Sequence, residues 1–144
     1  MAEEAAPTDN SPSLRLISSR DLSGGTAQTP GMARFEAISG NACGSDAIWM
    51  GETRVAAATR SANHHHGVSE TGIYVVSGHP VFVVGDGAGG ERRLETSPGD
   101  YVYVPPFVPH REENPSPDEE AVVVIARTTQ EAIAVNLESL HGPT

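Results

Sequence analysis

The chain has 144 residues, among them 15 glycines, 11 prolines and six histidines, and its formal net charge is −10 at pH 7. That charge argues against nucleic acid or an anionic membrane as a partner, because both are bound through basic surfaces. The single cysteine, Cys43, excludes an intrachain disulfide, and no apolar run reaches the length of a membrane span. The N-terminus is acidic and lacks a signal-peptide pattern, so we expect a cytoplasmic protein.

In chain order, residues 1–12 predict a flexible tail and residues 13–144 predict one domain. Short apolar runs bounded by glycine and proline, without βαβ alternation, favour an all-β sandwich or barrel. We expect strands at 13–18, 33–39, 47–60, 72–78, 80–85, 91–96, 101–106 and 121–127, with a glycine-rich hairpin loop at 85–90. The final segment, 128–144, could pack outside the core, exchange with a second subunit or form a helical turn.

Three consecutive histidines, His64, His65 and His66, precede the strand expected at 72–78. Along a strand, residues i and i+2 share a face, so His64 and His66 project together while His65 projects the other way. Two neighbouring imidazoles form half of a transition-metal site. The proline-rich bend at 105–109 could aim His110 across a barrel at this pair.

Glu70, His79 and His141 also carry side chains that can bind a metal ion. Glu70 follows His66 by four residues and could return beside the pair through short turns. His79 lies at the far end of the next strand, roughly 25 Å from Glu70, and is excluded as a ligand. His141 belongs to the C-terminal tail, where we expect it to be solvated. Arg111 and Glu113 could form an ion pair at the mouth of the cavity.

Two segments around these histidines resemble the two signature motifs of the cupin superfamily. The first motif has the form G-x5-H-x-H-x3-4-E-x6-G, and it is matched by His64, His66, an acid near position 70 and Gly78. The second has the form G-x5-P-x-G-x2-H-x3-N, and it is matched by Gly99, Pro105, His110 and Asn114, with Phe107 in place of the second glycine. The resemblance implies a single-domain cupin, a double-stranded β-helix or jelly-roll-like barrel with a metal inside.

One departure from the first motif concerns its acidic ligand. Counted back from Gly78, the position of the acid falls on Thr71, one residue after Glu70. A slip of one residue turns a side chain to the opposite face of a strand. Two arrangements remain open: a bulge could rotate Glu70 inward, or a distorted strand end at Gly67 could bring His65 into the site.

A narrower resemblance is to the small zinc-dependent cupin polyketide cyclases of aromatic polyketide (resistomycin-type) antibiotic biosynthesis. It is carried by the short chain, the HHHG tract and the closing VNL segment. It implies a zinc ion held by four histidines, His64, His65, His66 and His110, at the base of an apolar cavity. It also implies a homodimer whose substrate is a polyketide intermediate, cyclised and aromatised through an intramolecular aldol reaction.

The chemistry of the candidate site leaves two alternatives to this interpretation. Zinc polarises carbonyls and lowers the pKa of its bound water to about 7, so that water is the expected base and no catalytic side chain is predicted. If Glu70 completes the shell instead, two histidines and a carboxylate predict Fe2+ and a dioxygenase or isomerase. A closed metal site would indicate a non-enzymatic cupin that binds a small molecule.

Overall fold

The computed structural model describes residues 13–141, so the tail expected at 1–12 and residues 142–144 lie outside the described part. The strands are β1 (Met32–Ile38), β2 (Trp49–Val55), β3 (Thr59–Arg60), β4 (His64–His65), β5 (Thr71–Ser77), β6 (Val81–Gly85), β7 (Glu91–Glu95), β8 (Tyr101–Val104), β9 (Arg111–Asn114), β10 (Ala121–Arg127) and β11 (Val135–Asn136). The helical elements within 13–141 are α1 (Gly40–Cys43) and a 3-10 helix at Ser19–Asp21. Neither of them has the length or hydropathy to cross a membrane.

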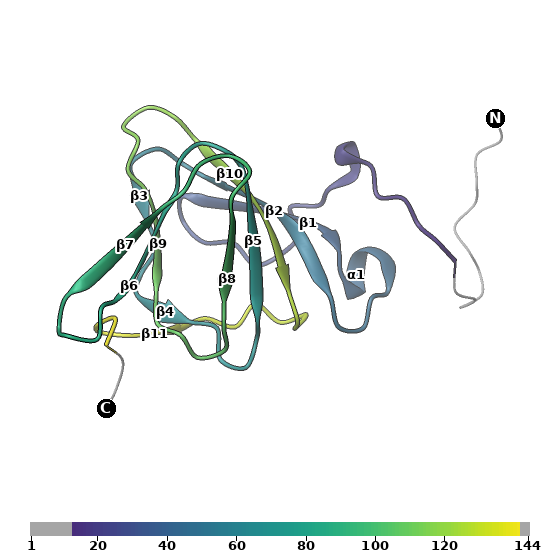
Figure 1. The fold of residues 1–144 in the computed structure, drawn as a ribbon. Coiled ribbons are helices and arrows are strands. Elements are labelled where there is room, and N and C mark those ends of the chain that lie inside the picture. The colour runs from purple at the N-terminus through teal and green to yellow at the C-terminus, as the bar shows by residue number, and fades with distance from the viewer. Residues whose placement is uncertain (1–12, 142–144) are drawn as a thin grey trace.

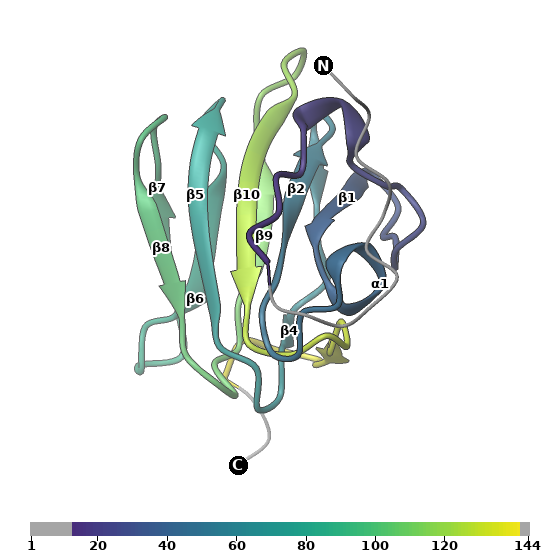
Figure 2. The same cartoon turned by 90° about the vertical axis from the view of Figure 1, so that its right-hand side faces the viewer.

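Two antiparallel sheets face each other across the core (Figure 1). The larger sheet has five strands in the order β1-β2-β10-β5-β8, which Figure 2 shows side by side. The smaller sheet has four strands in the order β3-β9-β6-β7, and β11 pairs with β4 at one end of the sandwich. Every strand pair is antiparallel, which confirms the predicted all-β, jelly-roll-like sandwich.

The core forms because alternate residues of each strand face inward. On β5, Thr71, Ile73 and Val75 are buried while Gly72 and Tyr74 are exposed on the other face. The main apolar cluster joins both sheets and contains Ile73, Val75, Phe82, Val104 and Val123. Full burial of each such side chain contributes about 1.5–3 kcal/mol, so this cluster holds the sheets together.

The structure differs from the predicted elements at four places. The single strand expected at 47–60 is divided into β2 and β3, which belong to different sheets. Residues 13–18 form no strand, and Leu14 and Leu16 are 96% and 87% exposed, because their alternating pattern meets no neighbouring strand within the described residues. The segment after the proline-rich bend, expected as a loop, contains β9. The tail expected at 128–144 contributes β11 rather than a helix within its described part.

Candidate metal centre

Three histidine side chains converge at one end of the sandwich interior. His64 and His110 exchange both backbone hydrogen bonds, each 2.9 Å from nitrogen to oxygen, so they lie directly opposite each other. The ring centroids are 4.5 Å apart for His64 and His110, and 4.8 Å apart for His64 and His66. One ring nitrogen from each of the three histidines lies within 4.8 Å of the others, a group that could hold a metal ion.

Backbone carbonyls fix the orientation of all three rings. In each ring, Nδ1 donates to a carbonyl oxygen: His64 to Ala62 at 2.7 Å, His66 to Ile133 at 2.8 Å, and His110 to Val108 at 2.9 Å. Because a carbonyl oxygen only accepts, each Nδ1 carries the proton and each Nε2 keeps a free lone pair. Histidines that bind metals are commonly oriented in this way.

Burial keeps these imidazoles uncharged. Desolvation lowers the pKa of His66 and of His110 to about 4, although the backbone hydrogen bond of each ring opposes the shift. Desolvation also lowers the pKa of His64 below 6.5. All three rings are therefore neutral at physiological pH, and a metal ion would bind them without displacing a proton.

His65 lies outside this group. Its Nδ1 accepts a hydrogen bond of 2.9 Å from the Gly67 backbone, so the proton of the neutral ring is on Nε2, the reverse of the other three rings. Its ring packs edge-on against Phe107, with the centroids 5.6 Å apart. Within residues 13–141 the structure thus assembles three histidines, and the fourth ligand implied by the resemblance stays a prediction.

The carboxylate alternative, Glu70, also lies away from the histidines. Its Oε1 accepts a hydrogen bond of 2.8 Å from the Tyr103 hydroxyl, and its side chain is exposed. The strands β5 and β8 pair in regular register from Thr71 to Tyr74, which keeps Glu70 outside. Thr71 holds the register position of the motif's acid, is 5% exposed and lines the same cavity as the histidines. A hydroxyl therefore replaces the usual carboxylate.

The two remaining histidines take no part in the group. Nδ1 of His79 lies 3.1 Å from the carbonyl oxygen of Thr96, and His141 is exposed. The structure thus places both residues outside the three-histidine group, as expected from the sequence.

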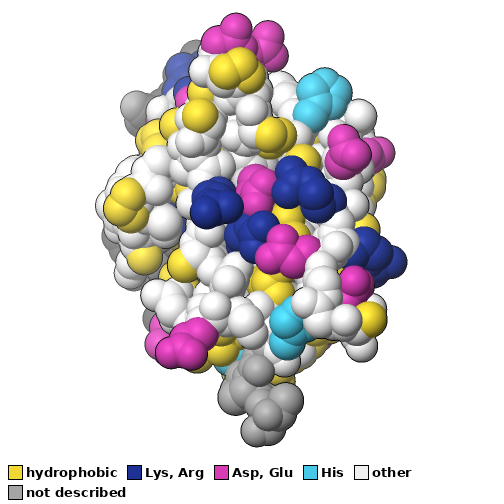
Figure 3. Space-filling view, turned by 90° about the vertical axis from the view of Figure 1, so that its left-hand side faces the viewer, with side chains coloured by type: hydrophobic (Ala, Val, Ile, Leu, Met, Phe, Trp, Pro, Cys, Tyr) yellow, Lys and Arg dark blue, Asp and Glu magenta, His cyan; other side chains and the backbone are white. Residues whose placement is uncertain are grey.

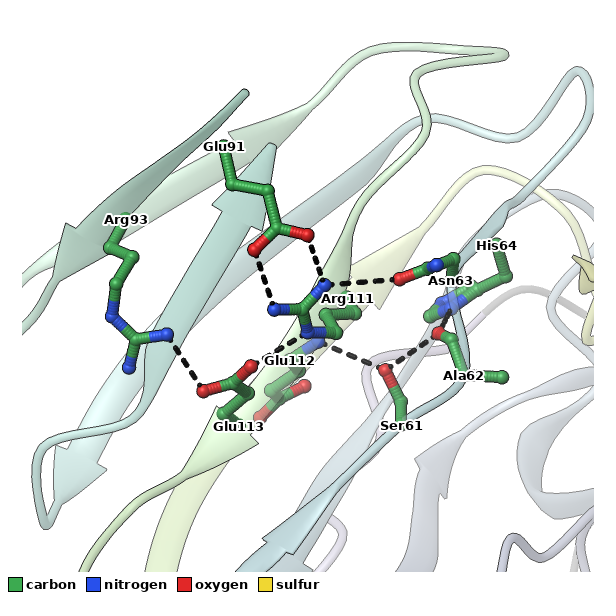
Figure 4. A network of polar contacts seen from close by, with 9 residues as sticks. All are labelled: Ser61, Ala62, Asn63, His64, Glu91, Arg93, Arg111, Glu112 and Glu113. Carbon is green, nitrogen blue, oxygen red and sulfur yellow. Dashed lines mark hydrogen bonds and ion pairs between the residues drawn. The ribbon is translucent and has the colours of Figure 1, made fainter. Parts of the chain in front are cut away.

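Charged side chains gather on the outer face of the four-stranded sheet (Figure 3). Arg111 lies 2.6 Å from Glu113 and 2.9 Å from Glu91, and Arg93 lies 3.0 Å from Glu113 (Figure 4). The predicted ion pair is present, but it lies outside the cavity rather than at its mouth. Alternate residues of β9 point outward, whereas Glu112 between them lines the cavity.

The histidines line a cavity of about 370 Å³ between the sheets. Its wall includes the apolar side chains of Met32, Ile73, Ile125 and Ile133. A second cavity of about 360 Å³ shares part of this wall and extends to Trp49. Volumes of this size are typical of sites for small molecules.

Three charged residues of the cavity were not predicted from the sequence, namely Arg34, Glu112 and Arg127. Glu112 is 9% exposed, and its Oε2 has no hydrogen-bond partner among the described residues. Burial raises the pKa of Glu112 to about 7, against the opposing charge of Arg34. Each of the three lies two residues from an inward-facing residue, so alternation would identify it only once the buried face of its strand is known.

At two positions where the motifs have glycine, this chain has another residue in the left-handed backbone conformation that favours glycine. Phe107 has φ of 64°, and Ala58, at the first glycine position of the first motif, has φ of 53°. This left-handed conformation costs an ordinary residue about 1–2 kcal/mol. The Phe107 amide donates to the Gly67 carbonyl at 2.9 Å, which ties the proline-rich bend to the histidine tract.

Comparisons with known proteins agree with this geometry. A family model described as a cupin domain matches residues 51–126, more than half of the chain, while no curated protein matches. The solved structure of the polyketide cyclase RemF from Streptomyces resistomycificus is 20% identical with a TM-score of 0.72, over 91% of this chain and 90% of that one. An oxalate decarboxylase variant from Bacillus subtilis is 25% identical with a TM-score of 0.64, over 77% of this chain but 29% of that one.

The matched residues 51–126 contain His64, His66 and His110. Both histidine segments lie at the positions that the superfamily motifs predict. The chain also folds as the two-sheet sandwich that the motifs imply. The chain therefore belongs to the cupin family, and its fold resembles that of a polyketide cyclase.

Proposed function

We propose that the protein is a zinc-dependent cyclase that closes a ring in a poly-β-keto chain by intramolecular aldol condensation. The observation that carries the proposal is the set of three imidazole Nε2 atoms at the wall of a cavity of about 370 Å³. The overall likeness in fold to a polyketide cyclase supports it.

The donor set fits a zinc ion. His64, His66 and His110 would hold the ion through neutral imidazoles, and Thr71 stands where a carboxylate ligand would favour Fe2+. When bound, the ion would act as a Lewis acid on a substrate carbonyl. For His65 to join as the fourth ligand, its ring would have to turn and release the Gly67 amide.

The residues of the cavity would direct which atoms react. An aldol condensation removes a proton from one carbon, joins that carbon to a carbonyl carbon, protonates the carbonyl oxygen and then eliminates water. Apolar side chains such as Ile73 and Ile125 would fold the chain and exclude bulk water, which is control by proximity. Oε2 of Glu112 has no hydrogen-bond partner among the described residues, and Glu112 lines the cavity, so this carboxyl could accept the proton.

The test is a cyclisation assay with a synthetic poly-β-ketone and purified protein. Zinc-loaded wild type should give one dominant aromatic product by mass spectrometry, while chelator-treated protein and His66→Ala should give the mixture that forms without protein. If wild type also gives that mixture, the protein is not a cyclase for this class of substrate.

An iron- or manganese-dependent cupin is the second candidate. It is favoured by the likeness to oxalate decarboxylase, which is described as having Mn(II) centres. Elemental analysis of purified protein separates the two, since stoichiometric iron or manganese would contradict the zinc proposal. A metal-free native protein would instead favour a non-enzymatic binding role. We also propose a homodimer, which light scattering would refute by showing a monomer.

A further inference from the structure

Two arginines enter the cavity at positions where a sandwich normally places apolar residues. On β1, Arg34 lies between Met32 and Glu36, which are 3% and 6% exposed. On β10, Arg127 follows the inward-facing Ile125. Strand alternation therefore turns both guanidinium groups toward the interior, and both line the cavity of the three histidines. Burying an unpaired charge is costly, so such a pair needs a physical reason.

Neutral groups hold both arginines in place. Nη1 of Arg34 donates to the Thr29 hydroxyl at 2.7 Å. Arg127 donates to two backbone carbonyls of the loop after β10, at 3.0 and 2.8 Å, and its guanidinium carbon lies 4.0 Å from the centroid of the Trp49 ring. None of the ion pairs within residues 13–141 includes either arginine, in contrast with Arg111 on the outer face. The two side chains are thus oriented by neutral groups, while the carboxyls of Glu112 and Glu36 act on them from beyond ion-pair distance.

The charges of both arginines act on the cavity. Burial lowers the pKa of Arg127 to about 10, with Arg34 lowering it further and Glu36 opposing, so the group stays charged at neutral pH. The pKa of Arg34 is also lowered by burial, against Glu112. The lining of this cavity therefore carries two guanidinium groups against one carboxyl, that of Glu112 with its pKa of about 7, in a chain of net charge −10.

We propose that the cavity binds its substrate as an anion, with a carboxylate of the substrate held by Arg34 and Arg127. Planar guanidinium groups match carboxylates with paired, charge-assisted hydrogen bonds. The inference deepens the proposed cyclase function and rests on it for the nature of the substrate chain. It specifies a free β-keto acid rather than a chain bound as a neutral thioester.

The test compares 2,4-dihydroxybenzoate with its neutral methyl ester by calorimetry, using full-length zinc-loaded protein and the same protein after removal of the metal. In both forms the acid should bind about ten- to a hundredfold more tightly than the ester. Arg34→Gln and Arg127→Gln should each remove most of that preference, while Arg34→Lys should keep part of it. Arg92→Gln is the matched control, because Arg92 is exposed on β7, and it should bind like wild type.

Equal affinity of wild type for acid and ester, or no detectable binding of the acid, would overturn the inference. So would a preference that persists in both glutamine variants or that disappears when the metal is removed. If a variant fails to fold, the comparison of acid and ester on metal-free wild type still decides. If the protein prefers the acid but does not cyclise the poly-β-ketone, the proposed function is refuted and the anion site is retained. If it cyclises the poly-β-ketone but does not prefer the acid, the anion site is refuted and the proposed function is retained.

Discussion

Replacing Glu112 with glutamine should change how the stability of the metal-free protein depends on pH. Burial raises the pKa of this carboxyl from an ordinary value of 4.5 to about 7 in the folded protein. Between these values the unfolded chain is ionised while the folded protein keeps its proton, so the free energy of unfolding falls as pH rises. Above both pKa values this decrease in the free energy of unfolding is complete, and the difference between the two pKa values corresponds to about 3 kcal/mol.

Glutamine resembles the protonated carboxyl in shape and does not titrate. The stability of Glu112→Gln relative to wild type should therefore increase by about 2.5 kcal/mol between about pH 5 and about pH 8. Comparing the two pH values cancels packing effects of the substitution, and the titration of the histidines is common to both proteins. Urea unfolding can be followed by the fluorescence of Trp49, the single tryptophan, which is 2% exposed.

The neighbouring residue, Glu113, provides a matched control on the opposite face of β9. Although burial acts to raise its pKa, hydrogen bonds from Arg111 and Arg93 hold the pKa of Glu113 below its ordinary value. It is therefore ionised in both states above about pH 5, and Glu113→Gln should show no change in relative stability across the same range. A Glu112→Gln variant that behaves like this control would show that the carboxyl is not buried in the cavity.

Four further substitutions test the site and its support. Phe107→Gly should raise the free energy of unfolding by about 1 kcal/mol by relieving the left-handed backbone, and a lower urea midpoint than wild type would contradict that strain. Asn114→Ala should lower it by about 2–4 kcal/mol, because its buried amide nitrogen contacts three carbonyl oxygens at 2.8 to 3.3 Å; an unchanged midpoint would argue against this role. His65→Ala should retain the metal that His110→Ala loses, and elemental analysis showing loss from both would support the four-histidine shell.

Much of the candidate site was predictable because it depends on local rules. Alternation along a strand separates His65 from His64 and His66, and the structure has this arrangement. The second motif placed His110 opposite them, because its proline-rich bend is short and rigid. Counting from Gly78 also located Thr71 at the position of the missing acid, where it lines the cavity.

The charged part of the cavity was not predictable in the same way. Arg34 and Arg127 lie on strands whose inner faces are defined only once β1, β2 and β10 are paired. Each strand alone is compatible with either face being buried. Likewise, the alternating pattern at Leu14 and Leu16 suggested a strand, but strand formation also requires a neighbour with free backbone groups.

The most direct test of the metal centre is the zinc content of the protein after loading and desalting. We expect one equivalent per chain in wild type and in His79→Ala, because the His79 imidazole bonds to the Thr96 carbonyl away from the three histidines. We expect none in His66→Ala, because the two remaining imidazoles of the group are too few to hold the ion. A full equivalent of zinc in His66→Ala would contradict the three-histidine site.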